Sequence, residues 1–117
     1  MTRIKRIDFN KVLSNFAGDK NLLKGTVNLS IKYLPTYFDR IKIALSSKNI
    51  QELELAAHTL KGSLSIYLYK PIVEIAFELE KIGQIENFEK AQKLVIDLEI
   101  QLKIFLKELK EFKKTFS

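Results

Sequence analysis

The sequence predicts an all-α protein: an antiparallel up-down-up-down four-helix bundle with a short N-terminal helix that covers one end. Three observations carry this prediction. Apolar residues recur every three or four positions over four long segments, which is the spacing of an amphipathic helix. The connections between these segments are only a few residues long, as expected between antiparallel neighbours in a bundle. Lastly, no segment shows the alternation that is typical of a β-strand.

The first two helices are marked by residues that favour helix ends. Asp8 is suited to cap a short helix, and Gly18 is expected to stop it. A second helix should begin near Asp19 or Asn21 and run to about Ser46. Pro35 lies inside this segment. Because the apolar spacing continues beyond the proline, we expect a kink rather than a break.

The remaining helices are bounded by prolines, glycines and turn residues. The third is predicted to begin near Asn49 and to run to about Tyr69. Pro71 fits the first turn of a fourth helix, which should end at Gly83. After a short connection, a last helix is predicted from about residue 87 to residue 112 or beyond. Its apolar residues alternate in steps of three and four, as in the seam of a bundle.

Length and composition limit the kinds of function that are available. The 117 residues fit a single domain spanning 1–117, which should bury roughly two-thirds of the surface that its unfolded chain exposes. The sequence has no cysteine and one histidine, which excludes disulfides, thiolate metal sites and two-histidine zinc motifs. It contains neither a nucleotide-binding motif nor a run of eighteen apolar residues, so we expect a cytoplasmic protein without an ATP site of its own.

The one histidine, His58, is the candidate for chemistry. On a helical projection of the third helix it lies far from the predicted buried stripe, so its imidazole should face water. Lys61 follows at a spacing that keeps its ammonium near the ring, and an ammonium is suited to a phosphate oxygen. Gly62 lies on the same side, where a helix-weakening glycine indicates close approach of another body. The predicted buried stripe consists of Leu53, Ala56, Ala57, Leu60, Leu64, Tyr67 and Leu68.

The segment His58-Thr59-Leu60-Lys61-Gly62-Ser63 resembles the signature of histidine-containing phosphotransfer (HPt) domains, which act in two-component phosphorelays. The similarity covers nearly the whole chain. Further landmarks at about the expected separations are Ile7-Asp8-Phe9, Gly18-Asp19, Leu22-Leu23, Pro35 and Ala44-Leu45. After Ser63 the chain departs from the family pattern, because Ile66, Leu68 and Tyr69 stand where many members have an asparagine and a turn of small residues.

The resemblance implies a phosphocarrier rather than an enzyme. His58 would accept a phosphoryl group from the phosphoaspartate of a receiver domain, or from a hybrid kinase, and pass it to another receiver aspartate. Family resemblance implies that Nε2 is the acceptor atom, whereas the residues alone leave both ring nitrogens open. The partners would be response-regulator receivers and a sensor or hybrid histidine kinase. No cofactor is expected on this chain, and the Mg²⁺ would come from the receiver.

Several residues around His58 are predicted to contact the partner. Leu55, Ile66 and Tyr69 are expected to form an apolar rim around the charged centre, and Glu54 and Ser65 lie on the same side of the helix. Glu54 could also orient the imidazole by accepting its other N–H. We expect the chain to act as a monomer.

Two other classes of function remain open. One is a helical binding or adaptor protein that has lost phosphotransfer, which the departures after Ser63 would allow. The other is a nucleic-acid or membrane binder, suggested by the net charge of +6 and the lysine-rich end of the last helix. We expect neither nucleic acid nor membrane as a partner, because Glu99, Glu108 and Glu111 interrupt the basic face and the lysines are dispersed.

Overall fold

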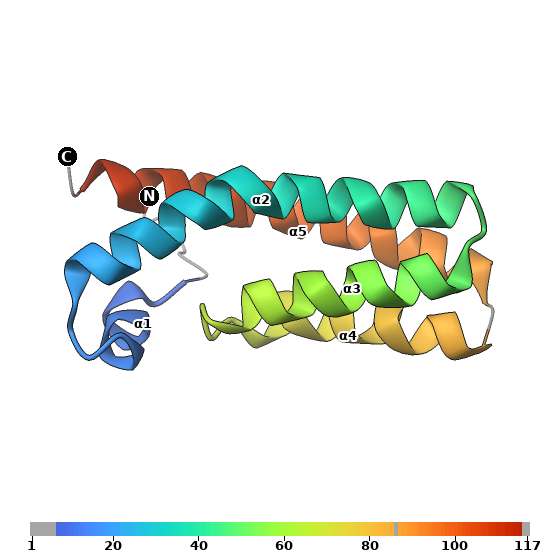
Figure 1. Cartoon of the computed structure of the whole chain (residues 1–117), viewed down its shortest axis with the longest axis horizontal. Coiled ribbons are helices and arrows are strands. Elements are labelled where there is room, and N and C mark those ends of the chain that lie inside the picture. Colours follow the sequence, from blue (N-terminus) through green and yellow to red (C-terminus); the bar gives the residue numbers. More distant parts are fainter. Residues whose placement is uncertain (1–6, 86, 116–117) are drawn as a thin grey trace, which may run out of the picture.

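The computed structural model describes residues 7–85 and 87–115, with only the backbone described for residues 83–85. This part of the chain forms five helices and contains no strand, which confirms the all-α prediction (Figure 1). Among the described residues, no helix is long and apolar enough to span a membrane. The helices are α1 (Phe9–Asn15), α2 (Lys20–Ser46), α3 (Ile50–Ser65), α4 (Lys70–Ile85) and α5 (Phe88–Lys114).

The four long helices pack as an antiparallel bundle in which each has two neighbours. α2 packs against α3 and α5, and α4 packs against the same two helices. The predicted bundle is therefore confirmed, with α2 and α5 along one side and α3 and α4 along the other (Figure 1). α2 and α5 have 27 residues each, whereas α3 and α4 have 16, so the first pair extends beyond the second at one end.

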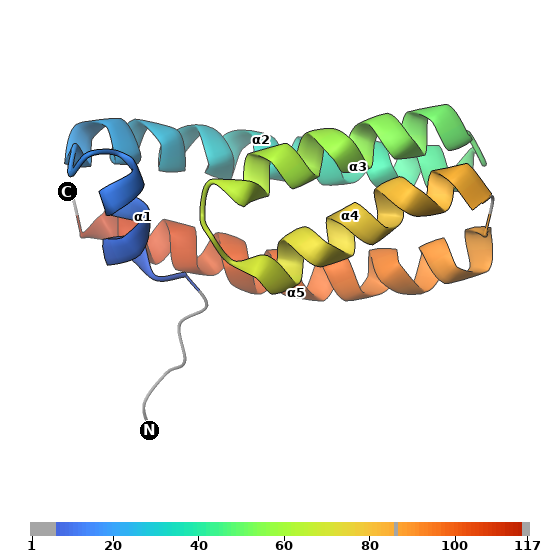
Figure 2. The ribbon, with the colours of Figure 1, turned by 90° about the horizontal axis from the view of Figure 1, so that it is seen from below.

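The short helix α1 occupies the space left by this difference in length. Figure 2 shows α1 lying between the ends of α2 and α5, beside the turn that joins α3 to α4. The Phe9 ring stacks on the ring of Phe112 in α5, with centroids 3.8 Å apart, and Val12 is fully buried. The backbone N–H of Ile7 donates to Glu108 Oε1 at 2.9 Å. These contacts fix α1 as the predicted cover over one end of the bundle.

Side chains cap the starts of four of the five described helices, as predicted for Asp8. The side chains of Asp8, Asp19, Asn49 and Asn87 each accept a hydrogen bond from a backbone N–H in the first turn of the helix that follows. After α1, Gly18 adopts a φ of +75°, which glycine tolerates at little cost, and its N–H bonds to the Leu13 carbonyl. Local polar chemistry therefore sets most of the helix starts.

α2 continues through Pro35 without interruption. In Figure 1 the helix changes direction near its middle, which is the part that contains the proline. This is the behaviour expected when a proline removes one N–H donor while apolar residues on both sides stay packed. Leu34 and Phe38, on either side of the proline, are both buried.

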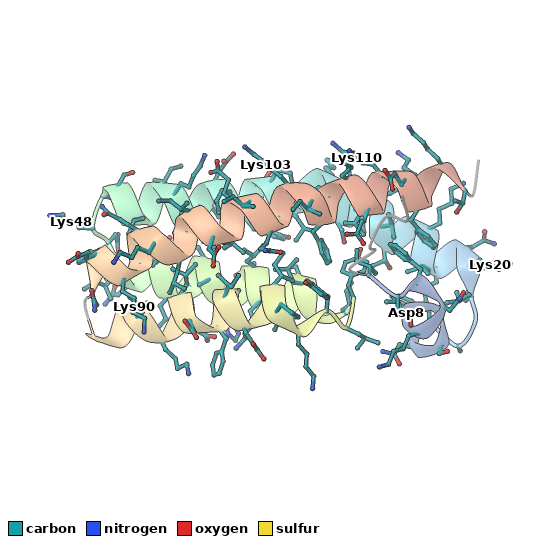
Figure 3. The ribbon with its side chains drawn as sticks, turned by 180° about the vertical axis from the view of Figure 1, so that it is seen from behind. Asp8, Lys20, Lys48, Lys90, Lys103 and Lys110 are labelled. Atoms are coloured by element: carbon teal, nitrogen blue, oxygen red, sulfur yellow. The ribbon has the colours of Figure 1, made fainter. Side chains whose placement is uncertain are left out.

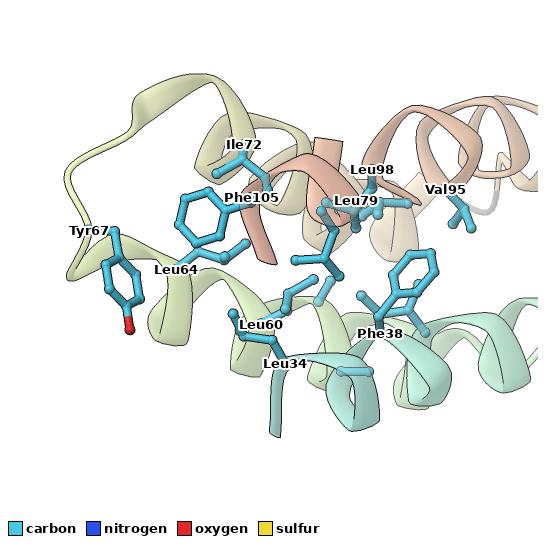
Figure 4. Packing of buried hydrophobic residues seen from close by; sticks show 14 of the residues in the cluster. Leu34, Phe38, Leu60, Leu64, Tyr67, Ile72, Leu79, Val95, Leu98 and Phe105 are labelled. Atoms are coloured by element: carbon cyan, nitrogen blue, oxygen red, sulfur yellow. The ribbon is translucent and has the colours of Figure 1, made fainter. Parts of the chain in front are cut away.

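The core runs along the axis between the four long helices and contains residues from each of them (Figure 4). Tyr67, in the turn that follows α3, is 1% exposed, and its ring meets that of Phe105 edge to face at 5.4 Å. Its hydroxyl donates to Ser30 Oγ in α2. Burial raises the pKa of Tyr67 to about 12, although the bond to Ser30 partly opposes the shift. This tyrosine ties the end of α3 to both α2 and α5.

Two predicted helix ends are wrong. α3 ends at Ser65, not near Tyr69, because residues 66–68 form a turn in which Leu68 adopts a φ of +59°. Leu68 consequently points away from the stripe in which it was predicted and is 42% exposed. α4 runs to Ile85, two residues beyond the predicted stop at Gly83, and Glu86 of the predicted connection lies outside the described residues.

Candidate functional site

His58 lies near the middle of α3 with its side chain 63% exposed. Its neighbours in the sequence hold it there, because Ala57 and Leu60 are fully buried on the opposite side of the helix. A helix packed on two neighbours gives the imidazole a rigid base while leaving the ring accessible. The predicted orientation of His58 toward water is therefore confirmed.

A carboxylate on the neighbouring helix joins His58 to Lys61. Glu80, in α4, lies 2.7 Å from His58 Nδ1 through its Oε1 atom. Its Oε2 atom accepts a 2.6 Å hydrogen bond from Lys61 Nζ. The lysine bond is the main cause that holds the pKa of Glu80 below its usual value, the bond to His58 acts in the same direction, and partial burial opposes both. Glu80 is therefore a carboxylate at neutral pH.

The carboxylate determines which ring nitrogen is available. An ionised carboxylate accepts hydrogen bonds and donates none, so the proton of the neutral imidazole lies on Nδ1. The lone pair that can attack an electrophile is then on Nε2. The choice of nitrogen, which the residues of the sequence leave open, follows from this contact between α3 and α4.

Lys61 is held beside His58 by two contacts with α4. Besides its bond to Glu80, its ammonium lies 4.8 Å from the centroid of the Phe77 ring, and Lys81 lies 4.4 Å from the same centroid. The Lys61 side chain is 25% exposed. These contacts hold the ammonium group at the edge of the site, one helical turn from the imidazole, and keep it from extending into water.

Gly62 faces open space. A Cβ atom built on this residue would meet no atom within 4 Å, and the residue has ordinary helical backbone geometry. Packing within the chain therefore gives no reason for a glycine at this position.

The predicted rim residues do not share one environment. Leu55 and Ile66 are 58% and 38% exposed, as predicted for an outer surface. Tyr69 was predicted to point away from the core, but it is half-buried and packs against it, because it follows the turn instead of continuing the helix. Ser65 is exposed, and its hydroxyl donates to the carbonyl of Lys61 at 2.7 Å.

Glu54 does not orient the ring. It borders a shallow hollow of about 290 Å³ together with Gln51, Leu55, His58 and Glu80, but the contact to Nδ1 comes from Glu80. The sequence reasoning missed Glu80 because the residue lies 22 positions from His58 on a different helix. Its position beside the buried Leu79 places it at the edge of the apolar face of α4, but only the register between α3 and α4 brings it to the imidazole.

Within the described ranges, no group of three acidic or histidine side chains is arranged to hold a metal ion. The site thus consists of a nucleophile, a carboxylate and a cation. Together with the fold, it defines a class of protein: a four-helix bundle with one exposed, oriented histidine beside a carboxylate and a cation.

Comparisons with known proteins specify this class. The family model of the Hpt domain matches residues 27–112, and the chain therefore belongs to the Hpt domain family. Hpt domains are phosphocarriers of His-Asp phosphorelays, so the chain is a histidine phosphotransfer protein by family. No curated protein matches it at a significant level.

The fold is similar to that of a solved family member. The crystal structure of histidine-containing phosphotransfer protein B (HptB) from Pseudomonas aeruginosa PAO1 matches with a TM-score of 0.88, covering 98% of this chain and 100% of that chain. The two sequences are 16% identical, so the similarity shows a common fold and no more.

Proposed function

We propose that this chain is a phosphorelay intermediate that accepts a phosphoryl group on His58 from the phosphoaspartate of a receiver domain and passes it to the aspartate of another receiver. The observation that carries the proposal is the pair of bonds that Glu80 makes to His58 Nδ1 and to Lys61. Membership of the Hpt domain family supports the class of reaction.

The chemistry is a reversible in-line transfer. The lone pair of His58 Nε2 attacks phosphorus, the N–P bond forms, and the P–O bond to the aspartyl carboxylate breaks, so the partner recovers its carboxylate. The ring gains a positive charge while Nδ1 keeps its proton. Glu80 stabilises this charge through the hydrogen bond that already holds the neutral ring. The reverse attack by a second aspartate returns the imidazole to its starting form.

Lys61 supplies positive charge to the phosphoryl oxygens. In the free chain its ammonium is bonded to Glu80, and a phosphoryl group on Nε2 would offer it a second anionic partner a short distance away. Among the described residues, the site contributes the nucleophile, this cation and the Glu80 carboxylate. The Mg²⁺ and the aspartate that complete the reaction are supplied by the receiver, and the chain itself binds no cofactor.

Partner docking is proposed around the exposed side of α3. Leu55 and Ile66 provide apolar contacts on either side of Gly62, which leaves room for the loop that carries the aspartate. Glu54 and Ser65 lie at the edge of this surface. Tyr69, which is half-buried, is a further proposed contact. The proposed partners are cytoplasmic receivers and a sensor or hybrid kinase, which the chain meets as a monomer.

The test is transfer from a phosphorylated receiver. The chain is incubated with the receiver and Mg²⁺, and acid-labile, alkali-stable phosphate is measured beside the His58→Ala variant. Label on the natural chain and none on the variant is expected. If phosphorylated receivers from the same cell transfer nothing to the natural chain, the proposal is wrong. The chain would then be a binding or adaptor bundle that uses the exposed Leu55 and Ile66.

A further inference from the structure

Formal charge is distributed unevenly between the two sides of the bundle. Counted from the sequence, α2 and α5 together carry +6, whereas α3 and α4 together carry −2. The positive pair forms one side, and the site at His58 and Glu80 lies on the negative pair. The net charge of the chain is therefore concentrated on the side away from the histidine.

The positive charge is arranged in rows along two antiparallel helices. On α5, Lys103, Lys107, Lys110 and Lys114 follow one another in steps of four, three and four, which places them in one row, and all are exposed. Figure 3 shows Lys103 and Lys110 at the edge of the molecule that faces away from α3 and α4. Lys32 of α2 is also exposed, and we call these five residues the lysine face.

The position of Lys32 along α2 places it on the same surface as the α5 row. It precedes Pro35, Asp39 and Lys42 in steps of three, four and three, and these three residues line a groove between α2 and α5. Since the two helices are antiparallel, residues before Pro35 lie beside residues after Leu106, the α5 residue in this groove. Lys32 therefore lies on the side of α2 that is turned toward the α5 row.

The glutamates predicted to interrupt this face do so less than the sequence indicates. Glu108 is 5% exposed, and it turns inward, where it accepts the N–H of Ile7. Glu99 is at the far end of the row, 3.5 Å from Lys103 and 4.0 Å from Lys42. Only Glu111 lies among the last three lysines of the row, and it is half-buried.

We propose that the lysine face binds the surface of a membrane that contains anionic lipids. Charge complementarity supports this occupant, because each lysine near an anionic bilayer adds to adsorption. Exposed apolar residues on the same outer side of α5 favour lipid over nucleic acid. Ile96 and Ile100 are 64% and 53% exposed and precede the row in helical register. The α5 row has neither the arginine nor the exposed aromatic residues with which proteins hold nucleic acids. On α2, the ammonium of Lys32 lies 5.3 Å from the ring centroid of Tyr33, which is 40% exposed, so the test below includes duplex DNA.

This binding would orient the protein. With α2 and α5 against the membrane, α3 and α4 face away from it, and His58 stays accessible to partners. The inference goes beyond phosphotransfer and does not depend on it, because no residue of the lysine face contacts the site. It differs from the expectation from the sequence that no membrane takes part.

The test is co-sedimentation of the full chain with vesicles of phosphatidylcholine, with and without about 30 mol% phosphatidylserine as the anionic lipid. Two triple variants are compared. One carries Lys107→Glu, Lys110→Glu and Lys114→Glu; the matched control carries Lys70→Glu, Lys81→Glu and Lys90→Glu, which are also exposed. Each lowers the formal net charge from +6 to zero.

The natural chain should bind the anionic vesicles, bind the neutral ones at least tenfold more weakly, and dissociate as salt is raised. The lysine-face variant should lose at least tenfold in affinity, while the matched control and His58→Ala stay within about threefold of the natural chain. Equal losses in both triple variants would show a net-charge effect and overturn the proposal. So would failure to bind anionic vesicles, or tighter binding to duplex DNA at the same salt concentration.

Discussion

Replacing Gly62 by alanine should make the protein more stable and less active. Glycine inside a helix is less favourable than alanine by about 0.5–1 kcal/mol. The added methyl group would meet no atom within 4 Å, so no clash reduces this gain. For a chain of this size the stabilisation corresponds to a rise in Tm of roughly 2–5 °C. If a receiver loop packs against Gly62, however, a methyl group in that contact costs about 1–3 kcal/mol, or roughly 5- to 150-fold in transfer efficiency.

Gly25 offers a matched control. It lies in α2, and a Cβ atom there would also meet nothing within 4 Å. Gly25→Ala should therefore raise Tm by a similar amount while leaving transfer unchanged. The assays are thermal unfolding followed by circular dichroism, and single-turnover transfer from a phosphorylated receiver at several concentrations of the chain.

Stability and transfer rate together show whether Gly62 serves the fold or the approach of a partner. Higher stability with slower transfer in Gly62→Ala alone supports close approach of a partner. Lower stability in Gly62→Ala would refute the reasoning, because it would mean that the fold itself requires the glycine. Transfer at the natural rate in both Gly62→Ala and Gly62→Leu would show that no partner packs against Gly62.

Three further predictions test other parts of the site and core. Glu80→Ala should slow transfer about tenfold or more, with partial rescue by Glu80→Gln, whose carbonyl still accepts from His58 Nδ1. The fold lowers the pKa of Glu80, so the ionised side chain stabilises the folded state above about pH 4.5, and this stabilisation is lost as the pH falls through the folded-state pKa. The difference in unfolding free energy between the natural chain and Glu80→Gln, measured in urea, should therefore shrink between pH 7 and pH 3. Leu55→Asp should weaken transfer about tenfold with Tm unchanged, and an unaltered dependence on receiver concentration would exclude this residue from docking. Tyr67→Phe removes the bond to Ser30 and should lower the free energy of unfolding in urea at pH 7 by about 0.5–1.5 kcal/mol. Because the natural hydroxyl has a pKa of about 12, the natural chain should lose stability between about pH 10 and pH 12. The same alkaline loss in the phenylalanine variant would contradict this assignment.

Much of the fold is predictable because its signals are local. Asp8, Asp19, Asn49 and Asn87 mark helix starts through a side-chain oxygen that reaches the next backbone N–H, and apolar spacing identifies the buried faces. The end of α3, by contrast, has no such local signal in the sequence. Leu68 adopts a left-handed φ that leucine rarely takes, and no glycine marks the turn, so the periodicity alone extends the helix too far.

The site is predictable only in part, for the same reason. His58, Lys61 and Gly62 lie on one stretch of one helix, so their relation follows from helical geometry. Glu80 comes from another helix, and its contact depends on the register in which α3 and α4 pack. Glu108 shows the same limit on the opposite side of the bundle, since only the contact with Ile7 reveals that it is buried.

In the proposed mechanism, Nε2 of His58 carries the phosphoryl group because Glu80 holds a proton on Nδ1. The most direct measurement is ¹⁵N and ³¹P NMR of the chain after phosphorylation by a receiver, with selectively labelled histidine. We expect phosphorus coupled to Nε2, a proton retained on Nδ1, and no phosphohistidine signal from His58→Ala. Phosphorus on Nδ1, or phosphate that persists in His58→Ala, would contradict it.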